Sequence, residues 1–142
     1  MGDDHLQKFG EIKVSEIMVK NPLFVTPDEK ISKTELLMLR KKIGGLPVGK
    51  DQKNKQLIGI ITQRDIRLAR FAMSLESPNT TIKDLMTSEP FVVKRDETVK
   101  DILKLMFEKN IQRLPVVNDT KQLIGLIVQN QILKKLYEFM KN

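Results

Sequence analysis

The chain carries one stretch of sequence twice, and this repeat limits its fold more than any other feature does. When residues 14–51 are placed over 82–119, and 55–66 over 121–132, 21 of the 50 aligned pairs are identical. The identical pairs include the segments Leu46-Pro47-Val48 and Leu114-Pro115-Val116. Self-similarity at a fixed spacing is the signature of a repeated structural unit. The two halves are therefore expected to share one fold.

Each half is predicted to fold in the order β-α-β-β-α. A short β-rich run follows a proline, and a helical pattern comes next. In the second half, Val99, Ile102, Leu103 and Met106 lie at i, i+3, i+4 and i+7, so they are predicted to form one buried helix face. Two short strands joined by a polar turn and a closing helix complete the unit. The predicted elements are 23–26, a helix ending near 43, 46–49, 57–61 and 63–73, then 91–94, a helix ending near 111, 114–117, 123–128 and 129–139.

Two helix starts carry capping signals, Ser32 with Glu35 and Thr98 with Asp101. A three-stranded sheet with two helices has an exposed apolar face and a small core. The predicted fold class is therefore α/β (α+β), with two pseudo-symmetric units packed sheet to sheet. The predicted divisions are an N-terminal tail (1–12), unit one (13–73), a linker (74–80) and unit two (81–140).

The composition excludes several classes of chemistry. The chain has no cysteine, and its single histidine, His5, is expected to be a mobile tail residue. Disulfides, thiolate metal sites and serine–histidine catalysis have no residues to use. No carboxylates or lysines are spaced for acid–base work, so we expect no enzyme, no catalytic residue and no metal site. No apolar run suits a membrane span or signal peptide, which favours a cytoplasmic protein.

The formal charge of +7 favours acidic partners in general. The lysines are spread along the chain, however, and aromatic residues make up only 5% of it. Proteins that bind single-stranded nucleic acid usually stack bases on aromatic side chains. The charge is therefore interpreted mainly as a solvated surface, and nucleic-acid binding is kept as a lesser alternative.

The repeated motifs resemble those of the CBS domain, named after cystathionine β-synthase. These motifs are I-M-x-x-x-P, then L-P-V, then L-I-G-I-I-T-Q-R-D, and they span about Lys13 to Phe139. The pair is similar to a tandem CBS (Bateman) module, and we expect it to be a stand-alone module without an effector domain. The resemblance implies a regulatory module that binds AMP, ADP or ATP, with S-adenosylmethionine or NADH as further candidates. It also implies a homodimer formed through helices and an effector protein of unknown identity, and it implies no required cofactor.

The resemblance also implies which residues bind the ligand. The family's signature G-h-x-[ST]-x-x-D is intact at Gly59–Asp65, where Asp65 would accept hydrogen bonds from ribose hydroxyls and Thr62 would bind phosphate. Carboxylates and helix N-termini suit these two roles. Arg113 matches a basic position that meets phosphate in the γ subunit of AMP-activated kinase, and its guanidinium suits phosphate. The full predicted set is Ile60, Thr62, Asp65, Met86, Thr87, Pro90, Phe91, Gln112 and Arg113.

Structural interpretations stand beside these functional ones. Thr62 and Asp65 have the spacing of a capping box, which can serve the helix alone or coexist with a ligand site. Arg113 is equally well interpreted as a surface arginine. In the second half, Val128 and Gln131 replace the threonine and the aspartate, so we expect one nucleotide site per chain. The alternative functions are a structural dimerisation module without ligand and a basic nucleic-acid-binding module.

Overall fold

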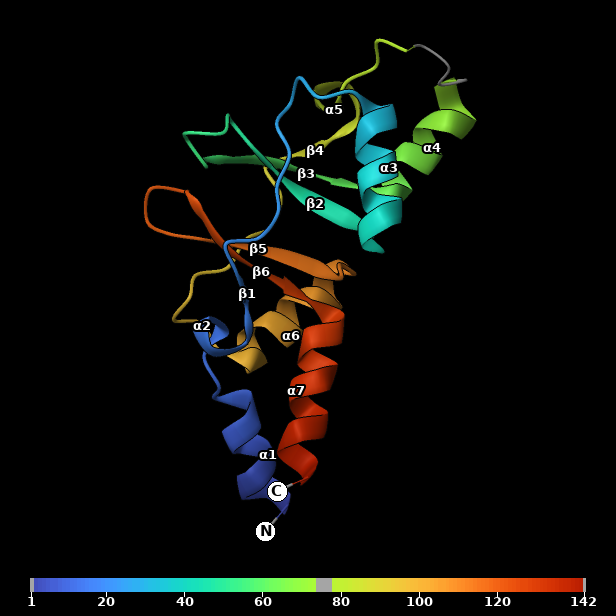
Figure 1. Cartoon of the computed structure of the whole chain (residues 1–142). Coiled ribbons are helices and arrows are strands. Elements are labelled where there is room, and N and C mark those ends of the chain that lie inside the picture. Colours follow the sequence, from blue (N-terminus) through green and yellow to red (C-terminus); the bar gives the residue numbers. More distant parts are fainter. Residues whose placement is uncertain (1, 74–77, 142) are drawn as a thin grey trace. The chain divides into compact units, whose positions relative to one another are not determined.

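The computed structural model describes residues 2–73 and 78–141. Two compact units divide the chain. Unit 2 comprises Leu23–Pro90, and unit 1 comprises the residues up to Pro22 together with those from Phe91 onward. Helices and small sheets occur in both units, as the α/β prediction requires (Figure 1). Residues 74–77 of the predicted linker lie outside the described residues, and within the described ranges no helix is long and apolar enough to cross a membrane.

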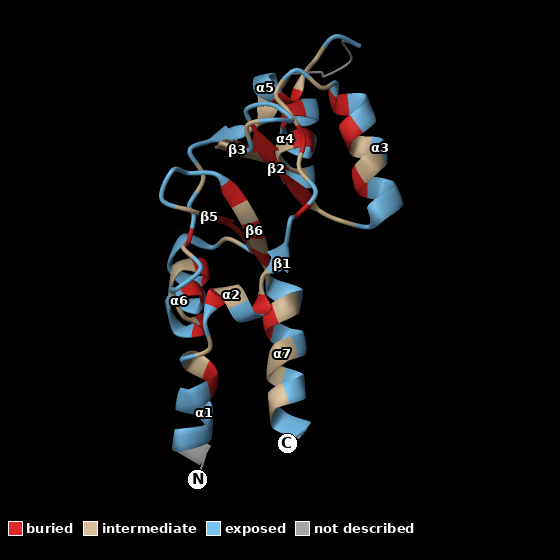
Figure 2. Ribbon diagram, turned by 60° about the vertical axis from the view of Figure 1, so that its left-hand side comes forward, coloured by how far each residue is buried: buried red, intermediate tan, exposed pale blue. Residues whose placement is uncertain are grey.

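Unit 2 is built on an antiparallel sheet with the strand order β2-β3-β4. A hairpin joins β2 (Gly45–Gly49) to β3 (Leu57–Thr62), within one residue of the predicted bounds, and β4 (Thr87–Ser88) pairs with the other edge of β3. All of β2 is buried, as Figure 2 shows in red. The core is formed mainly by aliphatic side chains from this sheet and from helices α3 (Ile31–Lys41), α4 (Gln63–Met73) and α5 (Ile82–Leu85).

Unit 1 repeats this architecture with the strand order β1-β6-β5. Its strands are β1 (Val19–Lys20), β5 (Arg113–Val117) and β6 (Leu123–Val128). Burial of aliphatic side chains again holds the sheet and helices together, because every such side chain removed from water stabilises the fold. The helices of unit 1 are α1 (Gly2–Gly10), α2 (Val14–Ile17), α6 (Val99–Lys109) and α7 (Gln129–Lys141).

The third strand of each sheet comes from the segment that opens the other sequence repeat. Strand β1 lies in the opening segment of repeat one, yet it pairs with β6 of repeat two, Val19 opposite Leu126. Strand β4 opens repeat two and pairs with β3 of repeat one, Thr87 opposite Ile60. The opening segments 13–22 and 81–90 are thus exchanged between the repeats. The sequence repeats therefore do not coincide with the compact units, because each unit takes its third strand from the opening segment of the other repeat.

Two sequence predictions about local structure need correction. The runs 23–26 and 91–94 each contribute one bridging residue rather than a strand, because the chain turns away immediately afterwards. Val25 makes a parallel bridge to Val48. Its backbone N–H donates to the Pro47 carbonyl, and its own carbonyl accepts from the Gly49 N–H. The predicted cap at Ser32 is also wrong. Helix α3 begins at Ile31, its N-cap is Lys30, and Glu35 pairs with Arg70 instead.

Residues Gly2–Gly10 form helix α1 rather than an irregular tail. The His5 ring stacks on Phe139 of α7, with the ring centroids 4.2 Å apart, and His5 Nε2 lies 3.2 Å from the Phe139 carbonyl oxygen. Phe9 is only 4% exposed and joins the core of unit 1. The expectation of a mobile His5 is therefore wrong, because the rings of His5 and Phe9 both contact the ring of Phe139 near the other end of the chain.

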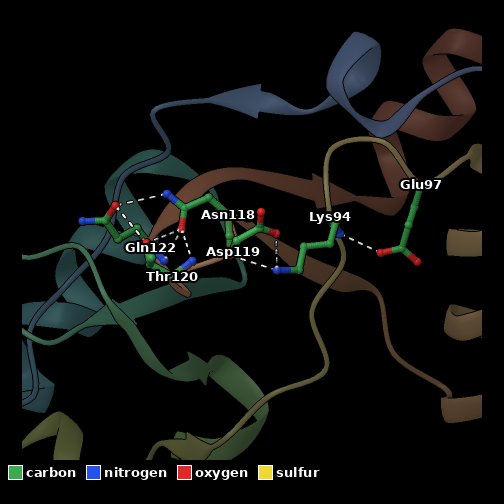
Figure 3. Close-up of polar contacts among 6 residues, drawn as sticks. All are labelled: Lys94, Glu97, Asn118, Asp119, Thr120 and Gln122. Atoms are coloured by element: carbon green, nitrogen blue, oxygen red, sulfur yellow. Dashed lines mark hydrogen bonds and ion pairs between the residues drawn. The ribbon is translucent and has the colours of Figure 1, made fainter.

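The polar turn predicted between β5 and β6 is ordered by its own side chains (Figure 3). Asn118 Oδ1 accepts hydrogen bonds from the backbone N–H groups of Thr120 and Gln122, at 3.0 and 2.9 Å. Lys94 Nζ donates to the Asn118 carbonyl at 3.0 Å and lies 3.4 Å from Asp119 Oδ1. Asparagine and aspartate favour such turns because their short side chains reach the nearby backbone. The hairpin register is fixed as a result.

Left-handed backbone occurs at equivalent positions just after the two exchanged strands. Asn21 has φ 47° and Glu89 has φ 50°, and a proline follows each. Asparagine adopts this conformation more readily than glutamate does. We expect Glu89→Asn to raise the free energy of unfolding by about 0.5–1 kcal/mol, and the reciprocal Asn21→Glu to lower it by a similar amount. Urea unfolding measures both, and an unchanged or lower midpoint for Glu89→Asn would contradict the expectation.

Candidate ligand site

Thr62 and Asp65 lie where β3 ends and α4 begins. The Thr62 backbone nitrogen and hydroxyl oxygen are each 2.9 Å from Asp65 Oδ2, and the Asp65 backbone N–H donates to Thr62 Oγ1 at 3.1 Å. These reciprocal bonds form a capping box, so the structural interpretation of the pair is confirmed. They also hold the carboxylate in one orientation. Both side chains are half-buried, which leaves part of the carboxylate accessible.

Thr87 brings a third group to this carboxylate from the exchanged strand β4. Its hydroxyl lies 3.3 Å from Asp65 Oδ1, on the oxygen that the capping box does not use. A carboxylate oxygen can accept two hydrogen bonds, and Oδ1 accepts only this long one among the described residues. Asp65 is therefore held firmly through one oxygen, while the other remains available to a further donor. The resemblance to the family implied that Thr62 and Asp65 would face Thr87, and this hydrogen bond joins Thr87 to Asp65.

Close packing of β4 on β3 depends on Gly59 and Met86. A side-chain carbon at Gly59 would lie 2.8 Å from Met86 Sδ and 2.9 Å from the Thr87 backbone oxygen, too close for either atom. Gly59 therefore permits the close approach of the two strand backbones. Met86 packs against the core of unit 2, and Ile60 is half-buried opposite Thr87. The local sequence thus fixes where Thr87 meets Asp65.

The remaining predicted residues divide between the two compact units. Pro90 is the last residue of unit 2, whereas Phe91, Gln112 and Arg113 belong to unit 1. Phe91 is 49% exposed, and Lys109 Nζ lies 5.3 Å from its ring centroid. The Gln112 carbonyl accepts a hydrogen bond from the first residue of α7 at 3.1 Å. Thus five of the nine, Ile60, Thr62, Asp65, Met86 and Thr87, lie around β3 and β4 of unit 2.

Arg113 begins strand β5, opposite Val128. Partial burial lowers the pKa of its guanidinium, since removal from water disfavours the charged form. Within the described part of the chain, the guanidinium has no ion pair or hydrogen bond. A half-buried cation without a partner is suited to binding an anion. This position therefore differs from an ordinary exposed arginine.

The equivalent position in unit 1 lacks the polar groups of the candidate site. Val19, Val128 and Gln131 replace Thr87, Thr62 and Asp65. Gln131 Oε1 accepts the Val128 backbone N–H at 3.3 Å, so the glutamine still caps α7. The cap is kept while the carboxylate and both hydroxyls are lost. Helix capping alone therefore does not require the residues found in unit 2.

A second comparison separates capping from ligand chemistry. Thr98 and Asp101 form the same capping box at the start of α6, with both bonds to Asp101 Oδ2 at 2.9–3.0 Å. As with Asp65, the side chain of this aspartate is linked to the preceding threonine. No third residue contacts Asp101 as Thr87 contacts Asp65, among the side chains that the structure describes. Asp101 therefore serves as a matched control for Asp65.

A scan of family models matches the CBS domain at residues 14–71 and again at 82–138. The chain belongs to the CBS domain family. Inosine-5'-monophosphate dehydrogenase from Methanocaldococcus jannaschii is 35% identical over 123 residues, which are 87% of this chain and 23% of that enzyme. The Bacillus subtilis enzyme of the same name is 32% identical over 139 residues, 96% of this chain and 27% of the enzyme. The chain thus spans about a quarter of the length of these relatives.

Solved structures of CBS pairs are similar over nearly their full length. The structure of CBSX2, a CBS-pair protein from Arabidopsis thaliana, in complex with AMP has a TM-score of 0.78 and 25% identity, and covers 92% of this chain and 99% of that one. The CBS domain pair of protein MJ0100, in complex with 5'-methylthioadenosine and S-adenosyl-L-methionine, has a TM-score of 0.77 and 27% identity, with 89% and 96% covered. Each of these two CBS pairs thus binds an adenosine-containing ligand.

Proposed function

We propose that this chain is a regulatory CBS module that binds an adenine nucleotide of the AMP, ADP or ATP type and acts on a partner protein. The observation that carries the proposal is the Asp65 carboxylate, which Thr62 orients through Oδ2, while Oδ1 accepts only the 3.3 Å bond from Thr87 among the described residues. Ribose hydroxyls would bind at Oδ1 and replace the long bond from Thr87. The adenosine ligands of similar CBS pairs support this choice. No catalytic step is assigned to the module.

Isothermal titration with AMP, ADP, ATP, S-adenosylmethionine and NADH tests the proposal. We expect a dissociation constant below about 1 mM, equivalent to about −4 kcal/mol, for at least one adenine nucleotide. The stoichiometry should be one nucleotide per chain, because unit 1 has valines and a glutamine where unit 2 has its polar groups. If no ligand binds more tightly than this limit, the nucleotide proposal fails.

Arg113 is proposed to bind phosphate, on the resemblance to the family and because its half-buried guanidinium has no ion pair or hydrogen bond among the described residues. We expect Arg113→Ala to weaken AMP binding by about 10-fold or more, the size of a lost charge-assisted hydrogen bond. Adenosine, which has no phosphate, should bind equally well to the variant and to the original protein. Titration of both ligands against both proteins checks this, and an equal loss for adenosine would assign Arg113 a structural role.

A homodimer is proposed as the assembly of the module, and dimerisation without ligand is the second candidate function. Large apolar side chains are exposed on the two main helices of each unit, such as Leu39 (71%) and Phe71 (88%) in unit 2. Apolar surface of this kind often marks a protein interface. Regulation through a dimer requires a nucleotide to bind one state of the assembly more tightly than another.

A further inference from the structure

Met86 fills the place of a missing side chain in the sheet of unit 2. It directly precedes β4, and its backbone N–H donates to the Ile82 carbonyl at 2.8 Å. Gly59 lies on the core-facing side of β3, as the buried Ile61 does two residues further on. A side-chain carbon at Gly59 would lie 2.8 Å from Met86 Sδ and 3.3 Å from Met86 Cγ. The thioether of Met86 therefore packs directly on the glycine.

The same arrangement occurs at the exchanged strand of unit 1. Met18 directly precedes β1, and a side-chain carbon at Gly125 would overlap Met18 Sδ. Each exchanged strand is two residues long and forms two residue pairs with its neighbour. A strand this short makes few backbone hydrogen bonds, each of which adds only modestly to stability. The contact between methionine and glycine therefore matters for the position of the strand.

Met86 is partly exposed, unlike the most buried methionines. Met38 is 0% exposed and Met106 is 8% exposed, whereas Met140 on α7 is 71% exposed. The chain has seven methionines and no cysteine, so thioethers are its only sulfur groups. Peroxides convert a thioether to a sulfoxide, and access to solvent favours this reaction. Met86 thus combines access to an oxidant with a position that holds β4 on β3.

We propose that Met86 is an oxidation site, and that its sulfoxide releases β4 from β3. A lone pair of the thioether sulfur attacks one oxygen of hydrogen peroxide, so that an S–O bond forms and the O–O bond breaks. The proton of the transferred hydroxyl passes to the leaving oxygen, which departs as water. The sulfur is oxidised and the peroxide is reduced, so no further reactant is needed. Methionine sulfoxide reductases reverse the change.

The sulfoxide does not suit the surroundings of Met86. It is larger and more polar than the thioether, and a polar group packed on Gly59 beside the apolar core is unfavourable without a hydrogen bond. The oxidised side chain is therefore expected to turn toward water, and β4 is expected to leave β3 with it. Thr87 follows Met86 directly, so its hydroxyl moves away from Asp65 Oδ1.

The candidate ligand site loses one side when β4 leaves, because Met86 and Thr87 belong to the predicted ligand-binding set. Oxidation is therefore expected to weaken nucleotide binding. This consequence rests on the proposed function, whereas the oxidation of Met86 and the release of β4 do not.

Hydrogen exchange after graded treatment with hydrogen peroxide tests the oxidation site. Peptide mass spectrometry gives the sulfoxide content of each methionine, and deuterium uptake of residues 81–90 reports on β4. We expect this uptake to become faster by about 10-fold or more, in proportion to sulfoxide at Met86 rather than at Met140. A methionine sulfoxide reductase should restore slow uptake. Unchanged uptake with Met86 fully oxidised would overturn the proposal, as would a Met86 that is oxidised no sooner than the buried Met38.

Two leucine variants show which methionine is responsible. Met86→Leu keeps an apolar side chain of similar volume that peroxide does not oxidise. Met18→Leu, the equivalent change in unit 1, is the matched control. After the same treatment, uptake in residues 81–90 should stay slow in Met86→Leu and become fast in Met18→Leu. If uptake becomes equally fast in Met86→Leu, another methionine is responsible and the assignment fails.

Isothermal titration with AMP separates the oxidation site from the proposed function. Oxidation should weaken AMP binding by about 10-fold or more in the original protein and in Met18→Leu, and leave it unchanged in Met86→Leu. If the untreated protein binds no AMP, the nucleotide proposal fails, while hydrogen exchange still decides the oxidation site. Equal AMP affinity before and after the release of β4 would overturn the link between this strand and the ligand site.

Discussion

Replacing Asp65 with glutamine is expected to weaken AMP binding by about 10- to 100-fold, the loss that accompanies hydrogen bonds to a charged group worth about 1.5–3 kcal/mol. Glutamine is the residue that unit 1 carries at this position, where Gln131 still caps its helix through Val128. The fold should therefore survive the change while the ribose loses its carboxylate. Isothermal titration of the variant with AMP and ATP gives the affinity, and circular dichroism checks the fold.

Asp101→Gln is the matched control. It alters the same type of capping box, formed with Thr98, at a helix start where no described residue contacts the aspartate as Thr87 contacts Asp65. Nucleotide affinity should be unchanged in this variant. If Asp65→Gln binds AMP as tightly as the original protein, the carboxylate does not bind ribose, and the pair Thr62 and Asp65 serves only the helix.

The second large effect is expected from Ile61→Ala, which should lower the free energy of unfolding by about 2–5 kcal/mol. Ile61 is 0% exposed on β3 and lies within the core of unit 2. The loss combines the removed apolar atoms with the cavity left behind, because a close-packed core relaxes only in part. Domains are typically stable by only about 5–15 kcal/mol, so the variant loses a large share of its stability.

Leu39→Ala provides the comparison, because Leu39 is 71% exposed on α3. Its effect on unfolding should stay within about 0.5 kcal/mol. Urea unfolding followed by far-ultraviolet circular dichroism measures both variants. A loss below about 1 kcal/mol for Ile61→Ala would mean that the core of unit 2 is looser than its burial indicates.

The elements with strong local signals could be predicted from the sequence. The hairpins follow from alternating apolar residues around a polar turn, and the structure has them within one residue of the expected bounds. Two signals marked the pair Thr62 and Asp65. Its spacing suits a helix start, and the repeat around it resembles a family that binds ligands with these residues. The capping box of Thr98 and Asp101 was found by the same signal.

Features that depend on distant contacts could not be predicted. Helix α1 is held by Phe139, 134 residues away from His5, and no local pattern reveals such a contact. The exchanged strands are only two residues long, so the periodicity of the sequence does not indicate which strands they pair with. The bond between Thr87 and Asp65 depends on that exchange, and only the resemblance to the family indicated that these two residues would face each other. Leu103 fits the helical period but is 42% exposed, and an apolar residue at the border of a helix face can point to solvent or to the core.

The exchange of opening strands also affects how the chain can be divided. A fragment ending near residue 73 would contain β2 and β3 without β4, the strand that pairs with the edge of β3. It would also contain β1 without its partner β6. An uncovered strand edge is a template for pairing with another chain. Separately expressed halves would thus be complementary pieces, each holding the missing edge of the other, and reunion of the two would restore the threonine that meets Asp65.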